Sequence, residues 1–238
     1  MKRRAAPALV LLLVLAGCGG GSSHLTVFAA TSLKTAFERY DPSARFSFAG
    51  SDELAAQIRQ GSEPDVYAAA NTKLPAALFA QKLVGKPTVF AANRLVLAVP
   101  AGSAKVKSVN DLAKRGVKIA IGSAGVPVGS YTRQVVARLG PTEAKALFRN
   151  VRSEEPDVGG IVGKLTQGAV DAGFVYVTDV RATKGALRAV ELPARLEPAV
   201  RYGIAVVRGT IHARAARAFV RGLLAGKGRT TLTQAGFR

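Results

Sequence analysis

Along most of this chain, short runs of β-branched and aromatic residues alternate with amphipathic stretches, an alternation typical of α/β folds. The β-rich runs occupy 24–30, 45–49, 66–69, 89–99, 117–121, 172–177 and 202–207. Helices are expected from Ser32 to Tyr40 and at 52–60, 128–139, 158–166 and 213–224. The chain has 238 residues, 48% of them hydrophobic, which is enough to bury a core in one large domain or two small ones.

The N-terminal segment has the features of an export signal. Three basic residues, at positions 2–4, precede a short apolar run, 8–15, that is too short to span a bilayer. The run ends in Leu15-Ala16-Gly17-Cys18, which resembles a bacterial lipobox, in which the cysteine is lipidated. We therefore expect a signal peptide at 1–17 and a lipid anchor with a flexible Gly/Ser tether at 18–23. The alternative is a buried free cysteine; a disulfide framework is excluded because Cys18 is the only cysteine.

Small polar residues or glycines stand at four places where a strand or loop passes into a helix. The four turns are Ala30-Thr31-Ser32, Ala49-Gly50-Ser51, Pro127-Val128-Gly129-Ser130 and Asp157-Val158-Gly159. A helix N-terminus exposes N–H groups and a partial positive charge, so it can bind an anion. Ordinary N-capping explains each turn alone, but in α/β folds such turns gather at the carboxyl ends of the strands, where ligands bind.

Several segments resemble, in the same order, the periplasmic molybdate-binding proteins of ABC transporters. They are Val27 to Leu33, Phe48 to Ile58, Pro64-Asp65-Val66, Asn93 to Val96, Val126 to Tyr131 and Gly173 to Tyr176. The resemblance covers nearly all of the chain after the signal. It implies a periplasmic-binding-protein type II fold with two α/β lobes and a ligand cleft between them. The first lobe would comprise 24–93 and 205–238, and the second 94–204.

The same resemblance implies how a molybdate or tungstate oxyanion would be held. Ser32 and Ser51 would donate from hydroxyl and backbone N–H groups, Val128 and Val158 from backbone N–H groups, and Tyr176 from its phenol. No cofactor and no directly coordinated metal is expected, because molybdenum would be bound as its oxyanion. The protein would act as a monomer outside the cell membrane, anchored at Cys18, and would deliver its ligand to the permease and ATPase of a transporter.

Two departures from the family pattern bear on which oxyanion is bound. Asp52 follows Ser51 and would repel an anion if its carboxylate faced the cleft. Val128 is bulkier than the alanine common at that position and would narrow the pocket. The alternative function is therefore a receptor of the same fold for sulfate, phosphate or an organic acid. An organic carboxylate calls for an arginine in the cleft, for which Arg94 and Arg152 are the candidates.

The formal net charge of +19 first suggests a nucleic-acid partner. Removal of the three basic residues of the signal leaves +16, spread over many predicted helices. Tryptophan is absent and aromatic residues make up 6%, so stacking surfaces for bases are scarce. We expect no nucleic-acid partner. We interpret the excess positive charge as a diffuse electrostatic field that attracts anions or holds the domain near anionic lipids.

The remaining polar residues favour structural roles, and nothing in their spacing indicates an enzyme. The two histidines, His24 and His212, lack a partner at metal-ligand spacing. Asp65 is expected to fix a loop. Of the acidic cluster Glu154, Glu155 and Asp157, Asp157 is expected to cap the helix that begins at Val158.

Overall fold

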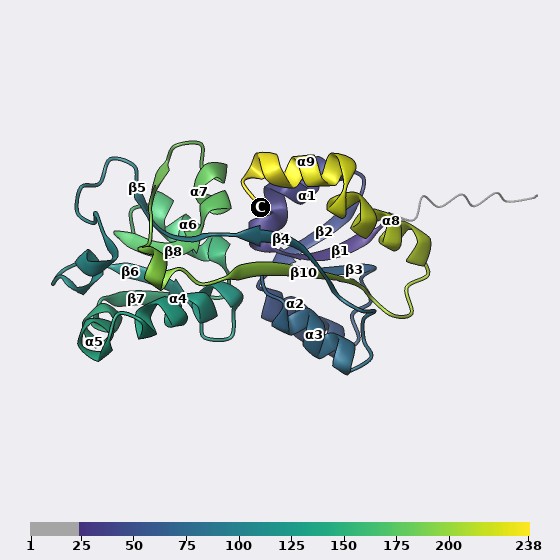
Figure 1. The fold of residues 1–238 in the computed structure, drawn as a ribbon, viewed down its shortest axis with the longest axis horizontal. Helices are drawn as coiled ribbons and strands as arrows, with labels where there is room; N and C mark the ends of the chain where they lie inside the picture. Colours follow the sequence, from purple (N-terminus) through teal and green to yellow (C-terminus); the bar gives the residue numbers. More distant parts are fainter. Residues whose placement is uncertain (1–23) are drawn as a thin grey trace, which may run out of the picture.

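A computed structural model describes residues 24–238, which form two lobes joined by two crossovers (Figure 1). The expected signal peptide, the anchor at Cys18 and the tether lie outside the described residues. No helix within the described part of the chain is both long enough and apolar enough to cross a membrane.

The first lobe contains a five-stranded sheet in the order β2-β1-β3-β10-β4. Strands β1 and β2 are parallel, as are β1 and β3, whereas β10 runs antiparallel to β3 and β4. The strands are β1 (Thr26–Ala30), β2 (Arg45–Ala49), β3 (Val66–Ala69), β4 (Thr88–Asn93) and β10 (Val200–Val206). The helices are η1 (Thr31–Leu33), α1 (Lys34–Tyr40), α2 (Ser51–Arg59), α3 (Lys73–Ala80), α8 (Ala213–Leu224) and α9 (Gly226–Ala235).

The second lobe repeats this plan with the order β7-β6-β8-β5-β9. Strand β6 is parallel to β7 and β8, and β5 is antiparallel to β8 and β9. The strands are β5 (Leu95–Pro100), β6 (Ile119–Gly122), β7 (Val151–Glu155), β8 (Ala172–Tyr176) and β9 (Leu187–Val190). The helices are η2 (Val109–Ala113), α4 (Pro127–Ala137), α5 (Pro141–Arg149), α6 (Val158–Thr166), α7 (Val177–Ala182) and η3 (Ala194–Leu196).

The chain passes between the lobes twice, from β4 to β5 and from β9 to β10. The continuous β-rich run 89–99 is therefore two strands in different sheets, with Arg94 between them. Strand β10 pairs with β4 from Val200 onward, so it joins the first sheet before position 205, the return point in the sequence-based division. Both crossovers lie side by side in the middle of the molecule (Figure 1).

One large hydrophobic cluster runs through both lobes and the crossovers. Tyr202 of β10 lies edge-on to Phe90 of β4, to Tyr176 of β8 and to Phe237 near the C-terminus. Edge-to-face contacts of this kind add to the free energy gained by burying the rings. These rings therefore pack β4 and β10 of the first lobe against β8 of the second and against the C-terminus.

Candidate anion site between the lobes

The four strand-to-helix turns meet at one cavity between the lobes. It is lined by Ala30, Thr31, Ser32, Ala49, Gly50, Ser51, Ala70, Val126, Pro127, Val128, Asp157, Val158 and Tyr176. We call it the central cavity. All five residues expected to contact an oxyanion are among its walls. Its volume is about 20 Å³, measured as the space open to the centre of a water molecule. Such a space suits a small inorganic ion, since pockets for organic ligands are typically about 300 Å³ or more.

Helix N-termini from both lobes border this cavity. Helix α2 begins at Ser51 and α4 at Pro127, and neither N-cap residue, Gly50 or Val126, forms a side-chain cap. Their first-turn N–H groups are therefore free of capping side chains. Helix α6 begins at Val158, where Asp157 accepts a hydrogen bond from Gly160 N at 3.0 Å, which confirms the expected cap. The cavity thus receives positive ends of helix dipoles from opposite sides.

Glycine allows the two lobes to approach each other at this point. A Cβ on Gly50, in the first lobe, would lie 2.5 Å from the carbonyl oxygen of Pro156 in the second. A Cβ on Gly159, in the second lobe, would lie 2.9 Å from Thr31 Cγ2 in the first. Because real Cβ contacts are not this short, a larger residue at Gly50 would force the two backbones apart, and one at Gly159 would displace the Thr31 side chain.

The Ser51 hydroxyl is oriented by backbone groups of its own lobe. Its Oγ accepts a hydrogen bond from Ala70 N at 3.1 Å, so its own hydrogen is left to donate. Tyr67 Oη donates to the Ser51 carbonyl at 2.6 Å and holds the start of α2 against β3. Ser51 is therefore a buried donor with one hydrogen directed to other acceptors.

A relay of side chains from the crossovers orients Ser32. Asn93 Nδ2 donates to Thr178 Oγ1 at 2.9 Å and to Tyr202 Oη at 3.4 Å. Tyr202 Oη lies 2.9 Å from Ser32 Oγ. Asn93 Nδ2 can only donate, so of these two neighbours only Ser32 Oγ can accept the Tyr202 hydrogen, and with the bond in that direction the Ser32 hydrogen is left for a ligand. Ser32, like Ser51, is thus set up as a donor.

Two hydroxyl groups on the cavity wall lack partners. Tyr176 Oη and Thr31 Oγ1 are buried and form no hydrogen bond with any described residue. A buried hydroxyl without a partner is costly, so such atoms point to a ligand that would supply the missing acceptor. Burial raises the pKa of Tyr176, which keeps the phenol protonated and able to donate. Sequence reasoning named Tyr176 but missed Thr31.

The described residues that line the central cavity include neutral donors, no Lys or Arg, and one carboxylate, Asp157, whose Oδ1 accepts the capping hydrogen bond from Gly160 N. Asp52 is not on its wall; one Asp52 oxygen approaches Gly125 of the second lobe, where a Cβ would lie 3.2 Å away. The Val128 side chain packs toward Gly122, which makes room for it by having no Cβ. Asp52 therefore contributes no atom to the cavity wall, although its buried Oδ1 has no partner among the described residues, and the Val128 side chain is accommodated by Gly122.

Neither arginine considered for an organic acid reaches the cavity. Arg94 pairs with Glu191 on the surface at 2.7 Å. Arg152 donates to the carbonyl oxygens of Arg149 and Val151 at 2.7 and 3.2 Å. The arginine clamp that a bound carboxylate requires is therefore not supplied by either residue.

The other polar residues have the structural roles expected of them. His24 Nδ1 lies 2.9 Å from the Ser43 carbonyl, and His212 Nδ1 lies 3.0 Å from Asp65 Oδ1. Asp65 also accepts from Thr26 N at 2.7 Å, which fixes the loop before β3. No group of three or more His, Cys, Asp or Glu residues in the described part of the chain is placed to hold a metal ion.

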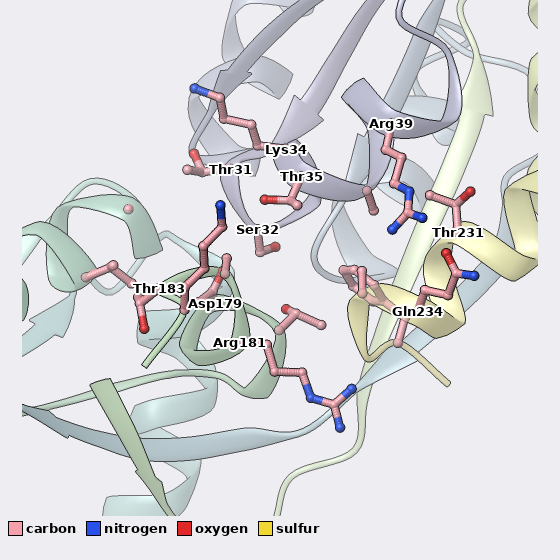
Figure 2. A pocket seen from close by; sticks show the side chains of 18 residues that line it. Thr31, Ser32, Lys34, Thr35, Arg39, Asp179, Arg181, Thr183, Thr231 and Gln234 are labelled. Atoms are coloured by element: carbon pink, nitrogen blue, oxygen red, sulfur yellow. The ribbon is translucent and has the colours of Figure 1, made fainter. Parts of the chain in front are cut away.

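A second, larger space adjoins the central cavity and shares Thr31 and Ser32 with it. This basic groove, of about 420 Å³, lies between α1, α7 and α9 and is lined in part by Lys34, Arg39, Arg181 and Lys184. Figure 2 shows Arg39 entering from α1 and Arg181 extending from α7 on the other lobe. None of these four cations forms an ion pair with another described residue.

Asp179 is the one carboxylate among the described residues that line the basic groove. It lies in the first turn of α7 and accepts a hydrogen bond from Tyr176 N at 2.9 Å. Burial, reinforced by the charge of Asp157, raises the pKa of Asp179 to about 7. The carboxyl is therefore partly neutral near physiological pH.

This arrangement defines a class: a two-lobed solute-binding protein with a small-anion cavity between its lobes. The chain belongs to the bacterial extracellular solute-binding protein family, whose model matches residues 25–238. Members of this family bind and transport solutes and are not enzymes, in agreement with the sequence prediction.

Similar proteins support the same class. The molybdate-binding protein ModA of Mycobacterium tuberculosis is 35% identical over 93% of this chain and 87% of its own length. A putative ABC transporter substrate-binding lipoprotein, YvgL of Bacillus subtilis, is 28% identical over 89% and 88%. The periplasmic molybdate-binding protein of Azotobacter vinelandii superimposes with a TM-score of 0.80 at 22% identity, over 90% of this chain and 99% of its own. The type II fold expected from the sequence is thereby confirmed.

Proposed function

We propose that this protein captures molybdate, or tungstate, outside the cytoplasmic membrane and delivers it to the permease and ATPase of an ABC transporter. The observation that carries the proposal is the set of neutral donors around one cavity, two of which, Tyr176 Oη and Thr31 Oγ1, are buried without a partner. The name of the M. tuberculosis relative, which includes molybdate, supports the choice of ligand.

Ser32, Ser51 and Tyr176 donate to the oxyanion from their hydroxyl groups in this proposal, and Val128 and Val158 from backbone N–H groups. A tetrahedral dianion that carries no proton is purely an acceptor, and the cavity presents donors. Each hydrogen bond to a charged group contributes about 1.5–3 kcal/mol, so several neutral donors can offset the cost of burying the anion. The positive ends of the helix dipoles add to this without placing a fixed cation beside the ion.

Lobe closure follows from where the donors lie. Ser32 and Ser51 belong to the first lobe, and Val128, Val158 and Tyr176 to the second. An ion bonded to both groups holds the lobes together, and the closed shape is the one that the permease would recognise. Closure requires Gly50, which faces the backbone carbonyl of Pro156, and Gly159, which faces the Thr31 methyl group.

The export signal suggests that the mature protein begins at Cys18 and is held to the membrane by a lipid there. The order of basic, apolar and small residues before Cys18 supports this anchor. The lipoprotein among its relatives supports it as well. Mass spectrometry of membrane-extracted protein should find a diacylglyceryl group on Cys18, and an unmodified cysteine would refute the anchor.

The ligand is tested by calorimetric titration with molybdate, tungstate, sulfate and phosphate. Tight binding of molybdate and tungstate, with at most weak binding of sulfate, is the expected result, because the larger ion keeps all donors within reach. Sulfate or phosphate binding as tight as that of molybdate would favour the alternative, a receptor of the same fold for another anion.

A further inference from the structure

The C-terminal part of the chain carries positive charge without any compensating carboxylate. Residues 198–238 contain eight Lys and Arg residues and no Asp or Glu. Three of these arginines, Arg214, Arg217 and Arg221, lie three and four residues apart on α8, so they project from one side of the helix. All three are exposed, and none forms an ion pair with another described residue.

Neighbouring segments extend this positive surface. Lys86, before β4, and Arg208, after β10, line a surface groove of about 540 Å³ together with Arg217 and Arg221 of α8. We call these two residues and the three arginines of α8 the α8 face. It lies on the first lobe, away from the central cavity, with which its groove shares no residue.

Two large apolar side chains flank the cations of the α8 face. Ile211, just before α8, is 90% exposed, and Leu224, at the end of the helix, is 43% exposed. The apolar side of α8 is already buried through Ala216, Phe219 and Leu223, so these two side chains are not part of the core. Exposed apolar groups beside a row of cations are typical of surfaces that adsorb to membranes.

The described chain also begins beside α8. His24 and Leu25 share a surface hollow with Ala215, Ala218 and Phe219 of this helix. If Cys18 carries a lipid, as proposed above, five residues separate it from His24, which limits the distance to about 20 Å. The anchor would therefore bring the bilayer to the α8 face and not to the far end of the molecule.

From the unpaired cations, the exposed Ile211 and the point where the chain enters the fold, we propose that the α8 face is a docking surface for the anionic lipid bilayer. Each cation near an anionic membrane surface strengthens adsorption about fivefold, so five together hold the domain against the bilayer. This contact concerns orientation at the membrane and leaves the central cavity free.

The test uses residues 18–238 with Cys18→Ser, so that no lipid is attached and the surface acts alone. The protein is sedimented with vesicles of phosphatidylcholine, either pure or mixed in equal parts with phosphatidylglycerol. We expect partition into the anionic vesicles only, weakening as salt rises. Arg214→Gln/Arg217→Gln/Arg221→Gln should lower the partition coefficient about a hundredfold at low salt.

A matched control neutralises three exposed cations at the other end of the long axis, around α5 (Figure 1). Arg115→Gln/Lys145→Gln/Arg149→Gln removes the same charge and should change the partition coefficient only a few fold. Equal losses in the two variants would overturn the proposal in favour of a diffuse field. Equal partition into neutral vesicles, or none into anionic ones, would also overturn it.

A second readout reports which face touches the lipid. The chain has no tryptophan, so Ile211→Trp introduces a single fluorophore on the α8 face. Phe148→Trp, at a side chain of α5 that is 41% exposed, is its counterpart at the far end. A blue shift and quenching by brominated lipid only at position 211 is expected; the same change at 148, or none at 211, would refute the proposal. Molybdate titration of the same proteins reports the proposed function separately.

Discussion

The central cavity and the basic groove share Thr31 and Ser32, yet they differ in the charged residues that line them. The cavity is small, its donors are neutral and its one charged described residue is the capping Asp157, whereas the groove is about 420 Å³ and carries four unpaired cations. Neutral donors hold a dianion while allowing its release, and exposed cations increase the rate at which it arrives. The difference indicates that the central cavity determines the affinity for the anion and the basic groove increases its rate of association. Mutations in each space can test this division.

Removal of both serine donors should have the largest effect. Ser32→Ala/Ser51→Ala deletes two hydrogen bonds to the ion, and at about 1.5–3 kcal/mol each the affinity for molybdate should fall a hundredfold or more. Calorimetric titration measures this loss. Ser62→Ala, which lies outside both spaces, is the matched control and should bind like the wild type. An unchanged affinity in the double variant would favour a different ligand.

Each serine also has a structural partner, and Ser32→Ala leaves the buried Tyr202 hydroxyl without its acceptor. Ser51→Ala leaves Ala70 N without its acceptor, which costs about 1–3 kcal/mol of stability. Thermal unfolding of each variant without ligand separates this cost from the change in affinity.

Tyr176→Phe should act on affinity and stability in opposite directions. The phenol has no partner among the described residues, so its removal should leave the ligand-free protein as stable or more stable. The affinity for molybdate should fall about tenfold or more, as measured by titration. Tyr40→Phe is the control with the opposite expected result. Tyr40 Oη donates to the Phe219 carbonyl at 3.1 Å, so this change should lower the stability of the protein and leave its affinity for molybdate unchanged. A Tyr176→Phe protein that is destabilised but binds normally would contradict the assignment.

Asp179 should make stability depend on pH. Its pKa is raised to about 7 in the folded protein and is about 3.9 in an unfolded chain. Between these two pKa values the folded state keeps the proton that the unfolded state loses. The contribution of this carboxyl to the free energy of unfolding is therefore lost as pH rises from about 4 to about 7. In the wild type this carboxyl lowers the free energy of unfolding by up to about 1.4 kcal/mol per pH unit in that window, and Asp179→Asn should abolish this decline. Urea unfolding at several pH values measures it, and parallel curves for both proteins would be the contrary result.

Neutralising the basic groove should have the smallest effect, and only on the rate of binding. Lys34→Gln/Arg39→Gln should slow association with molybdate a few fold at low salt and leave dissociation unchanged. Stopped-flow measurements over a range of ionic strength report both rates. Lys145→Gln/Arg149→Gln, on α5, is the charge-matched control. A faster dissociation in the groove variant would show that its cations hold the ion directly.

The sequence located most of the central cavity because its walls follow a local pattern. Ser32, Ser51, Val128 and Val158 each lie at a strand-to-helix turn, and sheet topology brings such turns together. Tyr176 came from family resemblance alone. Thr31 lies in the turn Ala30-Thr31-Ser32, but only the tertiary structure shows that its hydroxyl is buried without a partner. The relay through Asn93 and Tyr202, residues 109 positions apart, depends on tertiary packing and left no local signal.

Two of the elements that were not predicted from the sequence, α9 and β7, are locally atypical. Helix α9, GKGRTTLTQA, contains two glycines and three threonines, all poor helix formers, and it is stabilised by packing on α1 and α8. Strand β7, VRSEE, lies at the edge of its sheet, where polar residues are tolerated. In both cases tertiary contacts outweigh the intrinsic propensity.

The most direct test is a crystal structure of the molybdate complex, with the metal located by anomalous scattering at the molybdenum edge. We expect one strong peak in the central cavity, with oxygens bonded to Ser32 Oγ, Ser51 Oγ and Tyr176 Oη. A peak in the basic groove, against Arg39 or Arg181, with the central cavity empty, would contradict it.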